Sequence, residues 1–213
     1  MARPALGKGA TLSRAIESFT GKAPDPGVLE KFRRYLALLI AWNRTHRLTG
    51  ARSESSITRG LFVDSLLFLQ ELPPGPLSLV DIGTGPGIPG VPIRIVRPEI
   101  SLTLIDSRRK QVSFLESLKR ELDLPDLMIF EGRAEQLVAE YPSLAKAYDV
   151  VVTRAVGRQI LPTVARYLKS DGLFISGGPP APIDEVPSGP LRTEWKTVAN
   201  LGVRRTFLLG RFG

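Results

Sequence analysis

Apolar residues recur at three- and four-residue steps between positions 28 and 42, the spacing that one face of a helix requires. A second, shorter helix is expected over residues 61–72, because Pro73, Pro74 and Gly75 end the apolar pattern. We expect a domain boundary at this Pro/Gly stretch. It would separate a basic helical N-terminal extension, residues 1–75, from a larger domain, residues 76–213.

Beyond the boundary the pattern changes to short apolar runs rich in Val, Ile and Leu, which are typical of buried strands. These runs cover residues 77–82, 102–106, 127–130, 149–153 and 172–176, with helical stretches between them that are clearest at 108–122. Such alternation predicts an α/β fold with a doubly wound, mainly parallel sheet. Residues 204–211 are expected to form an antiparallel closing strand at the sheet edge, and residues 177–190 a loop.

Composition limits the chemistry that the chain can perform. Of the 213 residues, 43% are hydrophobic and 23% are charged, an ordinary globular balance. The absence of cysteine excludes disulfides, thiolate metal sites, iron–sulfur clusters and cysteine nucleophiles. The single histidine, His46, has no identifiable carboxylate partners, so no metal is expected. No apolar run approaches the roughly 18 residues of a membrane span, and residues 1–10 lack a secretory signal; we expect a cytoplasmic protein without a membrane partner.

The net charge of +8 is concentrated near the N-terminus, which favours a polyanionic partner. Residues 1–59 contain eleven Lys or Arg and four Asp or Glu, whereas the remainder is nearly neutral. The alternative is a solvated basic surface with no partner. Trp42 and His46 are candidates for stacking on a splayed base, although Trp42 ends the apolar stripe and fits a core anchor better. The candidate phosphate contacts are Arg33, Arg34, Arg44, Arg47, Arg52 and Arg59.

A glycine-rich segment, residues 81–90, follows the first predicted strand directly, and the next strand ends at Asp106. Asp81 and Asp106 are therefore expected at the carboxyl ends of strands, the edge of an open parallel sheet where ligands bind. Glycine lets the backbone turn tightly and approach a ligand closely. Asp106 can accept hydrogen bonds from a ribose diol, because an ionised carboxylate presents only acceptors.

Two cofactors fit this segment. Gly85, Gly87 and Gly90 match the dinucleotide fingerprint, but an acid at position 81 is unfavourable beside a pyrophosphate. The same acid suits S-adenosyl-L-methionine, which carries an ammonium group and a positive sulfur. A tight turn that binds no ligand is the remaining interpretation.

Two further segments follow later strands at the same expected edge. Residues 132–135, of sequence GRAE, come after the third strand and could cover an adenine ring, or could simply begin a helix with Glu135 in its first turn. Arg154 follows the fourth strand and could hold a cofactor carboxylate or a substrate phosphate in forked geometry. An ordinary surface ion pair is the alternative for Arg154.

Together these motifs resemble the ribosomal RNA small-subunit methyltransferase G family, also called glucose-inhibited division protein B. The resemblance rests on DIGTGPGIPG at residues 81–90, Asp106-Ser107, GRAE at residues 132–135 and Thr153-Arg154-Ala155. It extends upstream to Trp42-Asn43, Leu48-Thr49 and Asp64-Ser65-Leu66, so it spans most of the chain.

The resemblance implies a Rossmann-like class I methyltransferase. Such an enzyme uses S-adenosyl-L-methionine to methylate N7 of one guanine in 16S ribosomal RNA, in a hairpin near the decoding centre. Its partner would be the RNA, the small ribosomal subunit or an assembly intermediate of that subunit. The family's cofactor contacts fall on Gly83, Ile88, Ala134, Glu135 and Arg154, Asp106 would hold the ribose, and Asp81, Gly85 and Gly87 complete the expected cofactor-binding set.

Three departures from the family pattern bear on the RNA target and on activity, and leave the cofactor assignment intact. Arg47 precedes Leu-Thr where Asn is usual, Gly60-Leu61 replaces the usual Arg-His, and Gly177-Gly178 stands where Lys-Gly is usual.

Guanine N7 already carries an exposed lone pair, so its methylation needs positioning rather than proton removal. We therefore expect no general acid, general base or nucleophile, and we expect Arg154 to orient the cofactor or the base. No long apolar surface stripe demands a dimer, and a monomer is expected. Two alternatives stay open: a methyltransferase that acts on another RNA, a protein or a small molecule, and an NAD-dependent reductase.

Overall fold

A seven-stranded sheet forms the centre of the computed structural model, which describes residues 8–154, 158–178, 189–200 and 202–213. The strand order is β3-β2-β1-β4-β5-β7-β6. Strands β1 to β5 pair in parallel, β7 is antiparallel to β5, and β6 is antiparallel to β7. The strands are β1 (Ser78–Ile82), β2 (Ser101–Asp106), β3 (Met128–Glu131), β4 (Tyr148–Arg154), β5 (Leu168–Gly177), β6 (Arg192–Asn200) and β7 (Val203–Arg211).

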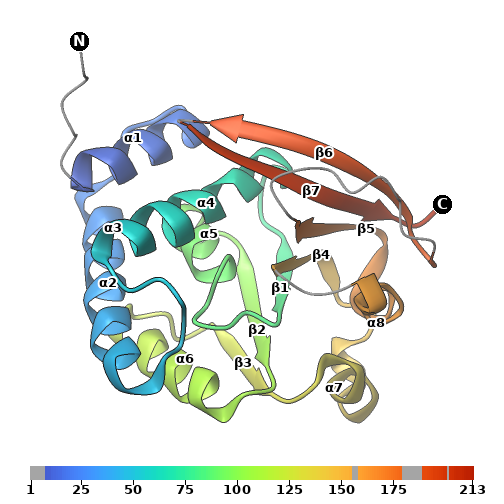
Figure 1. Ribbon diagram of the computed structural model, residues 1–213. Helices are drawn as coiled ribbons and strands as arrows, with labels where there is room; N and C mark the ends of the chain where they lie inside the picture. The colour runs from blue at the N-terminus through green and yellow to red at the C-terminus, as the bar shows by residue number, and fades with distance from the viewer. Residues whose placement is uncertain (1–7, 155–157, 179–188, 201) are drawn as a thin grey trace.

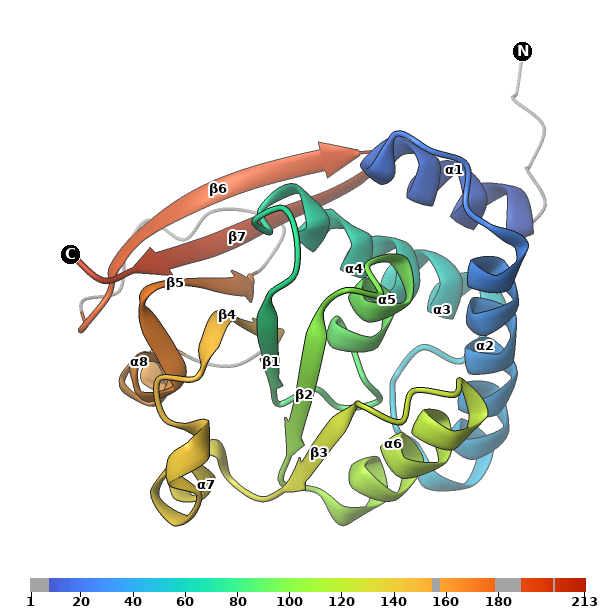
Figure 2. The ribbon, with the colours of Figure 1, turned by 180° about the vertical axis from the view of Figure 1, so that it is seen from behind.

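Helices cover both faces of the sheet (Figures 1 and 2). One face carries all the helices that precede β1, together with α5 and α6, whereas the other carries α7 and α8. The α-helices are α1 (Lys8–Thr20), α2 (Pro26–His46), α3 (Glu54–Ile57), α4 (Asp64–Leu66), α5 (Gly90–Val96), α6 (Arg109–Glu121), α7 (Ala134–Glu140) and α8 (Leu161–Tyr167). The remaining helical segments are the π-helix η1 (Thr58–Val63) and the 3-10 turns η2 (Leu67–Gln70), η3 (Pro142–Leu144) and η4 (Arg158–Ile160).

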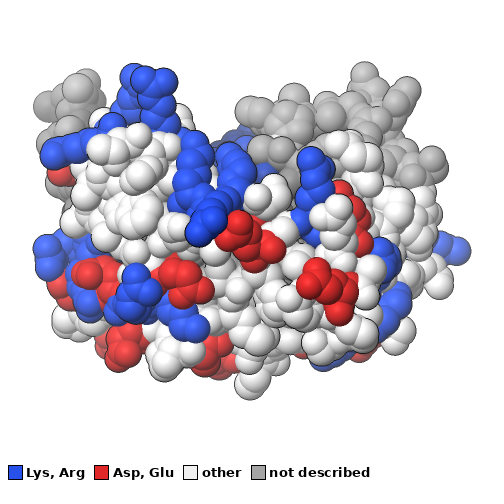
Figure 3. Space-filling model, turned by 90° about the horizontal axis from the view of Figure 1, so that it is seen from below, with Lys and Arg blue, Asp and Glu red and all other residues white. Residues whose placement is uncertain are grey.

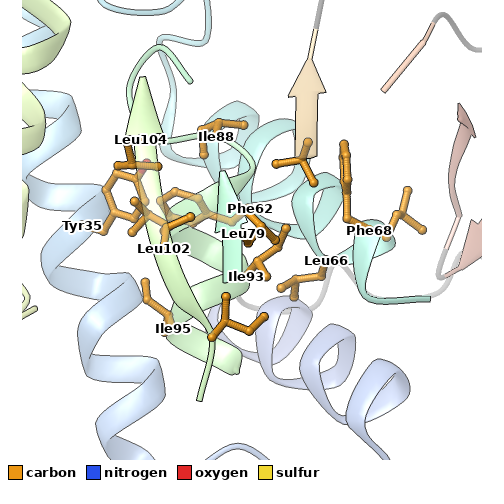
Figure 4. Close-up of a cluster of buried hydrophobic side chains, with 14 of the residues drawn as sticks. Tyr35, Phe62, Leu66, Phe68, Leu79, Ile88, Ile93, Ile95, Leu102 and Leu104 are labelled. Atoms are coloured by element: carbon orange, nitrogen blue, oxygen red, sulfur yellow. The ribbon is translucent and has the colours of Figure 1, made fainter. Parts of the chain in front are cut away.

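The helices before β1 share one continuous hydrophobic core with the sheet. Tyr35 of α2 and Phe62 of η1 are fully or almost fully buried, with ring centroids 4.8 Å apart, and they pack in the same cluster as Leu79 and Leu102 of the sheet (Figure 4). Trp42 packs edge-on against Phe114, so its predicted anchoring role is confirmed. The proposed division of the chain near residue 75 coincides with the turn before β1 and stays a prediction.

The predicted helix over residues 61–72 is part of a longer, irregular helical run. Four short segments follow one another without a break from α3 to η2, and the second of them is a π-helix. A π-turn is wider than an α-turn and often occurs beside functional sites. Here it directs the Gly60 carbonyl toward the end of β4, where it accepts a hydrogen bond from Arg154 (2.9 Å).

The predicted parallel strands and the predicted antiparallel strand over residues 204–211 are confirmed, but the expected position of that strand at the sheet edge was wrong. The strand expected over residues 204–211 exists as β7, and it lies inside the sheet between β5 and β6. The edge on this side is β6, whose sequence RTEWKTVAN is too polar to give a buried-strand pattern. Charged side chains such as Lys196 are common on edge strands, because they discourage pairing with another chain. Most of the loop expected over residues 177–190 lies outside the described residues.

The carboxyl ends of β1 to β4 meet at one edge of the sheet, and those of β2 and β3 point toward the bottom of Figure 1. The C-terminal end of α2 reaches the same edge. Lys110 donates from Nζ to the His46 carbonyl (3.1 Å), and the buried Gln111 donates from Nε2 to the Leu48 carbonyl (2.9 Å). These bonds join the end of α2 to the start of α6. Among the described helices, none is long and apolar enough to cross a membrane.

Candidate functional site

A tight glycine turn connects β1 to α5. Gly85 and Gly87 have φ values of +59° and +91°, a region that side chains with a Cβ rarely adopt. Gly87 also lacks space for a side chain, since an added Cβ would lie 2.8 Å from Cγ2 of Val91 and 3.0 Å from the Tyr35 hydroxyl. The Tyr35 hydroxyl in turn donates a hydrogen bond to the Pro86 carbonyl. The turn is therefore held against α2, which lies far from it in sequence.

Asp81 holds this turn through two hydrogen bonds. Its Oδ2 accepts hydrogen bonds from the Thr84 hydroxyl (2.7 Å) and the Gly90 amide (2.8 Å). The side chain is fully buried, and its Oδ1 has no hydrogen-bond partner in the part of the chain that the structure describes. Burial raises the pKa of Asp81 to about 7, although the bonds from Thr84 and Gly90 oppose the shift. A positively charged ligand nearby would stabilise the ionised form of this carboxyl.

Asp106, at the end of β2, binds the same turn at Gly85. Its Oδ2 accepts a hydrogen bond from the Gly85 amide (2.8 Å), and its Oδ1 accepts one from the amide of Arg108 (2.9 Å). The side chain is 3% exposed. The two acids that sequence reasoning singled out thus bind one glycine turn: Asp81 binds Thr84 and Gly90, and Asp106 binds Gly85 between them. Gly83, at the start of the turn, is exposed.

A cleft of about 390 Å³ opens beside Asp106 at the carboxyl edge of the sheet. Four of the predicted cofactor-binding residues line it: Gly83, Asp106, Ala134 and Glu135. Glu135 lies in the first turn of α7, as one interpretation of the GRAE segment predicted. Sequence reasoning did not identify the wall that η4 and α8 contribute, because no motif marks it. The described residues that line the cleft are Ile82, Gly83, Ile105, Asp106, Ser107, Arg108, Gly132, Arg133, Ala134, Glu135, Gln159, Ile160 and Thr163.

The other predicted cofactor residues do not line this cleft. Asp81 and Gly85 are buried within the turn, and Gly87 and Ile88 face the core between the turn and α2. These four residues shape the turn, and a direct contact from any of them to a cofactor stays a prediction. Arg154 lies at the end of the neighbouring strand, β4.

Arg154 belongs to a buried cluster of charges that sequence reasoning did not predict. Its Nη2 lies 3.3 Å from Oδ2 of Asp64, and Arg205 of β7 binds Oδ1 of the same carboxylate through Nε (3.0 Å) and Nη2. Asp64 is 3% exposed. Burial lowers the pKa of Arg154, whereas the charges of Asp64 and Asp81 raise it, and the Asp81 charge ties this cluster electrostatically to the glycine turn.

Gly177 adjoins this cluster at the end of β5. A Cβ added there would lie 3.1 Å from Cζ of Phe68 and 3.7 Å from Cγ of Arg154. Arg205 donates from Nη1 to the Gly178 carbonyl (3.1 Å). The glycine pair that departs from the family pattern is therefore packed closely against the charge cluster.

The six arginines predicted to contact RNA differ in whether other groups of the protein already bind their guanidinium groups. Arg33 pairs with Glu30 (2.5 Å), and Arg34 pairs with Glu121 (2.9 Å), so neighbouring acids already compensate both charges. Arg59 donates to the Gly202 carbonyl (3.3 Å). The other three, at or just beyond the end of α2, are exposed and form no ion pair with the described residues: Arg44, Arg47 and Arg52.

Basic side chains gather on the face of the molecule that carries the carboxyl edge. Figure 3 shows the molecule from below; Lys and Arg side chains lie in the upper and central part of this view, and further basic side chains lie among the acids below them. Among the described residues, no group of three or more His, Asp or Glu could hold a metal ion.

Comparison with known proteins identifies close relatives. The family model for rRNA small subunit methyltransferase G matches residues 28–176. The ribosomal RNA small subunit methyltransferase G of Methylobacillus flagellatus is 37% identical over 151 residues, which is 70% of this chain and 70% of the relative. The corresponding protein of a Roseiflexus species is 41% identical over 143 residues, covering 67% of this chain and 60% of the relative. That of Mesoplasma florum is 34% identical over 171 residues, covering 79% of this chain and 71% of the relative.

Solved structures confirm the fold class. An S-adenosyl-L-methionine-dependent methyltransferase from Aquifex aeolicus superimposes with a TM-score of 0.55 at 14% sequence identity. The match covers 77% of this chain and 96% of that chain. At this identity the likeness concerns the fold alone.

Replacement of Asp81 by Asn should change how stability depends on pH. The pKa of Asp81 is about 7 in the folded protein and near its ordinary value of 3.8 when unfolded. Between these two pH values the folded state therefore binds a proton on Asp81 that the unfolded state has lost. The contribution of this carboxyl to the free energy of unfolding should therefore fall as the pH rises from about 4 to about 7, by at most about 1.4 kcal/mol per pH unit. It should be constant above pH 7.

Urea unfolding at several pH values, for the natural protein and for Asp81→Asn, measures this contribution as the difference between the two curves. The exposed Asp123, replaced by Asn, is the matched control and should leave the pH dependence unchanged. Parallel curves for the natural protein and Asp81→Asn would contradict the predicted protonation.

Proposed function

The chain belongs to the rRNA small subunit methyltransferase G family and uses S-adenosyl-L-methionine, and we propose that it methylates N7 of one guanine in 16S ribosomal RNA through the cleft beside Asp106. The observation that carries this proposal is the pair of carboxylates, Asp81 and Asp106, that both bind the same glycine turn beside that cleft. A dinucleotide site would place a phosphate, rather than a buried acid, at this turn.

The residues around the turn fit S-adenosyl-L-methionine. The cleft offers a ribose acceptor in Asp106 and an apolar floor in Ile82, Ile105 and Ala134 for an adenine ring. Asp81, whose Oδ1 has no hydrogen-bond partner among the described residues, would in its ionised form favour the positive groups of the cofactor. In this arrangement Asp106 and Glu135 would hold the adenosine end of the cofactor, and the turn and Arg154 would hold its amino-acid end.

The bound cofactor supplies an activated methyl group on a positive sulfur. The protein must then bring guanine N7 in line with that methyl group and keep water away. No proton leaves N7 during the transfer, so no general base is needed. Arg154 is suited to orient either the cofactor carboxylate or the base, because its guanidinium is held rigidly by Asp64 and by the Gly60 carbonyl.

The exposed arginines at the end of α2 are our candidates for contact with RNA phosphates. The hydrogen bonds of Lys110 and Gln111 hold this end of α2 beside α6, which begins directly after the cleft residue Arg108. We further propose that the enzyme acts as a cytoplasmic monomer on the small ribosomal subunit or on an assembly intermediate, since its RNA-facing edge and its cleft lie on one chain.

Methyl transfer to 16S ribosomal RNA tests the proposed function directly. With labelled S-adenosyl-L-methionine, we expect one methyl group per RNA, and cleavage of the RNA at N7-methylguanine should map it to a single position. Transfer elsewhere in the RNA would overturn the proposed target. Equilibrium binding should detect S-adenosyl-L-methionine and not NAD, and the reverse result would overturn the cofactor assignment.

Replacement of Arg154 by Ala should lower the rate of methyl transfer on the order of a hundredfold, because a preorganised charge beside the reacting groups is lost. Arg205 still compensates Asp64 in this variant, so the fold should persist in circular dichroism and urea unfolding. Arg154→Lys should recover part of the rate, and Arg120→Ala, on the exposed face of α6, should have no effect. An unchanged rate for Arg154→Ala would remove this residue from the site.

Joint replacement of Arg44, Arg47 and Arg52 by Gln should weaken RNA binding and its dependence on salt. Loss of three phosphate contacts should reduce the slope of log affinity against log salt by about 2. The double replacement of Arg33 and Arg34 is the matched comparison, and it should change the slope less because both charges are compensated in the structure. Equal slopes for the natural protein and the triple variant would show that these arginines do not contact RNA phosphates.

A further inference from the structure

Arg108 covers the carboxylate that is expected to hold the cofactor ribose. Its Nε donates to Oδ1 of Asp106 (3.1 Å), and its Nη2 donates to Oδ2 (3.3 Å). The Arg108 and Gly85 amides already occupy one acceptor position on each oxygen. A carboxylate has about four lone-pair positions, so all of them are engaged in the free protein.

The four bonds differ in how easily they can be broken. The two amide donors belong to the backbone, Gly85 in the glycine turn and Arg108 two residues after Asp106, and they fix the orientation of the carboxylate. The two guanidinium donors belong to a side chain that is 56% exposed and lines the open side of the cleft. Nη2 of Arg108 also lies 3.7 Å from the position that a Cβ of Gly85 would take, so the guanidinium extends over the glycine turn. Rotation of this one side chain is enough to free two acceptor positions.

We propose that Arg108 blocks the ribose position in the free enzyme, that the cofactor ribose displaces it from Asp106, and that the released guanidinium joins the RNA-binding surface. This inference rests on the proposed function, because it assumes that Asp106 binds the ribose hydroxyls of S-adenosyl-L-methionine. Two hydroxyl donors replace the two guanidinium donors, and the carboxylate remains fully hydrogen-bonded.

The neighbourhood of Arg108 determines where the released charge goes. The next two residues, Arg109 and Lys110, are exposed, and Lys110 is bound to the His46 carbonyl at the end of α2, one residue before Arg47. A guanidinium that leaves Asp106 therefore enters a region of positive charge, where an RNA phosphate would compensate it. Cofactor and RNA must then favour each other's binding, since linkage between two sites is reciprocal.

The test compares binding of S-adenosyl-L-methionine to the natural protein, Arg108→Gln and Arg109→Gln by calorimetry. Removal of the competing guanidinium should tighten binding by about two- to tenfold in Arg108→Gln, as expected for loss of a partly exposed ion pair. Arg109→Gln is the matched control and should bind as the natural protein does. Adenosine, which carries the ribose but no amino-acid end, should show the same tightening.

A second arm adds a transcribed 16S ribosomal RNA. The RNA should tighten cofactor binding by the natural protein and by Arg109→Gln, and it should have a smaller effect on Arg108→Gln. Unchanged or weaker cofactor binding by Arg108→Gln would overturn the inference while leaving the proposed function in place. Failure of all three proteins to bind S-adenosyl-L-methionine would overturn both.

Discussion

The geometry of the site depends on the bonds from Asp81 to the glycine turn. A buried carboxylate is costly unless its oxygens are hydrogen-bonded, and Asp81 meets this requirement at one oxygen through Thr84 and Gly90. The other oxygen stays unpaired, and burial raises the pKa of the group to about 7. The carboxyl group that holds the turn thus has one oxygen without a hydrogen-bond partner among the described residues. A positively charged ligand would compensate the charge of this group. Asp106 binds the same turn at Gly85 and lines the cleft.

Those parts of the fold that bury apolar side chains were predictable from the sequence. The five parallel strands are continuous apolar runs, and α2 and α6 show a clear helical period. The polar strand β6 was missed for the opposite reason, because its charged residues resemble a surface loop. Residues 61–72, the later part of the irregular run from α3 to η2, were predicted as one regular helix, since a π-turn changes the hydrogen bonding without changing the composition.

Some parts of the candidate site were likewise predictable from the sequence, and others were not. The glycine turn follows Asp81 directly, and Asp106 ends the next predicted strand, so the strand pattern gave the positions of both acids at one sheet edge. The charge cluster of Asp64, Arg154 and Arg205 joins three segments that are far apart in the chain, and only the folded structure brings them together. The same holds for the wall of the cleft formed by Gln159 and Thr163, and for the pairing of Arg34 with Glu121.

The hydrogen bond from the Tyr35 hydroxyl to the Pro86 carbonyl has a consequence for the evolution of the chain. Through this bond α2 stabilises the glycine turn from its buried face, in addition to bearing basic residues on its exposed face. Insertions or deletions between α2 and β1 would shift that support, whereas the exposed face of α2 is free to change. Relatives that bind different RNA structures should therefore differ on the outer surface of this helix and keep its inner contacts.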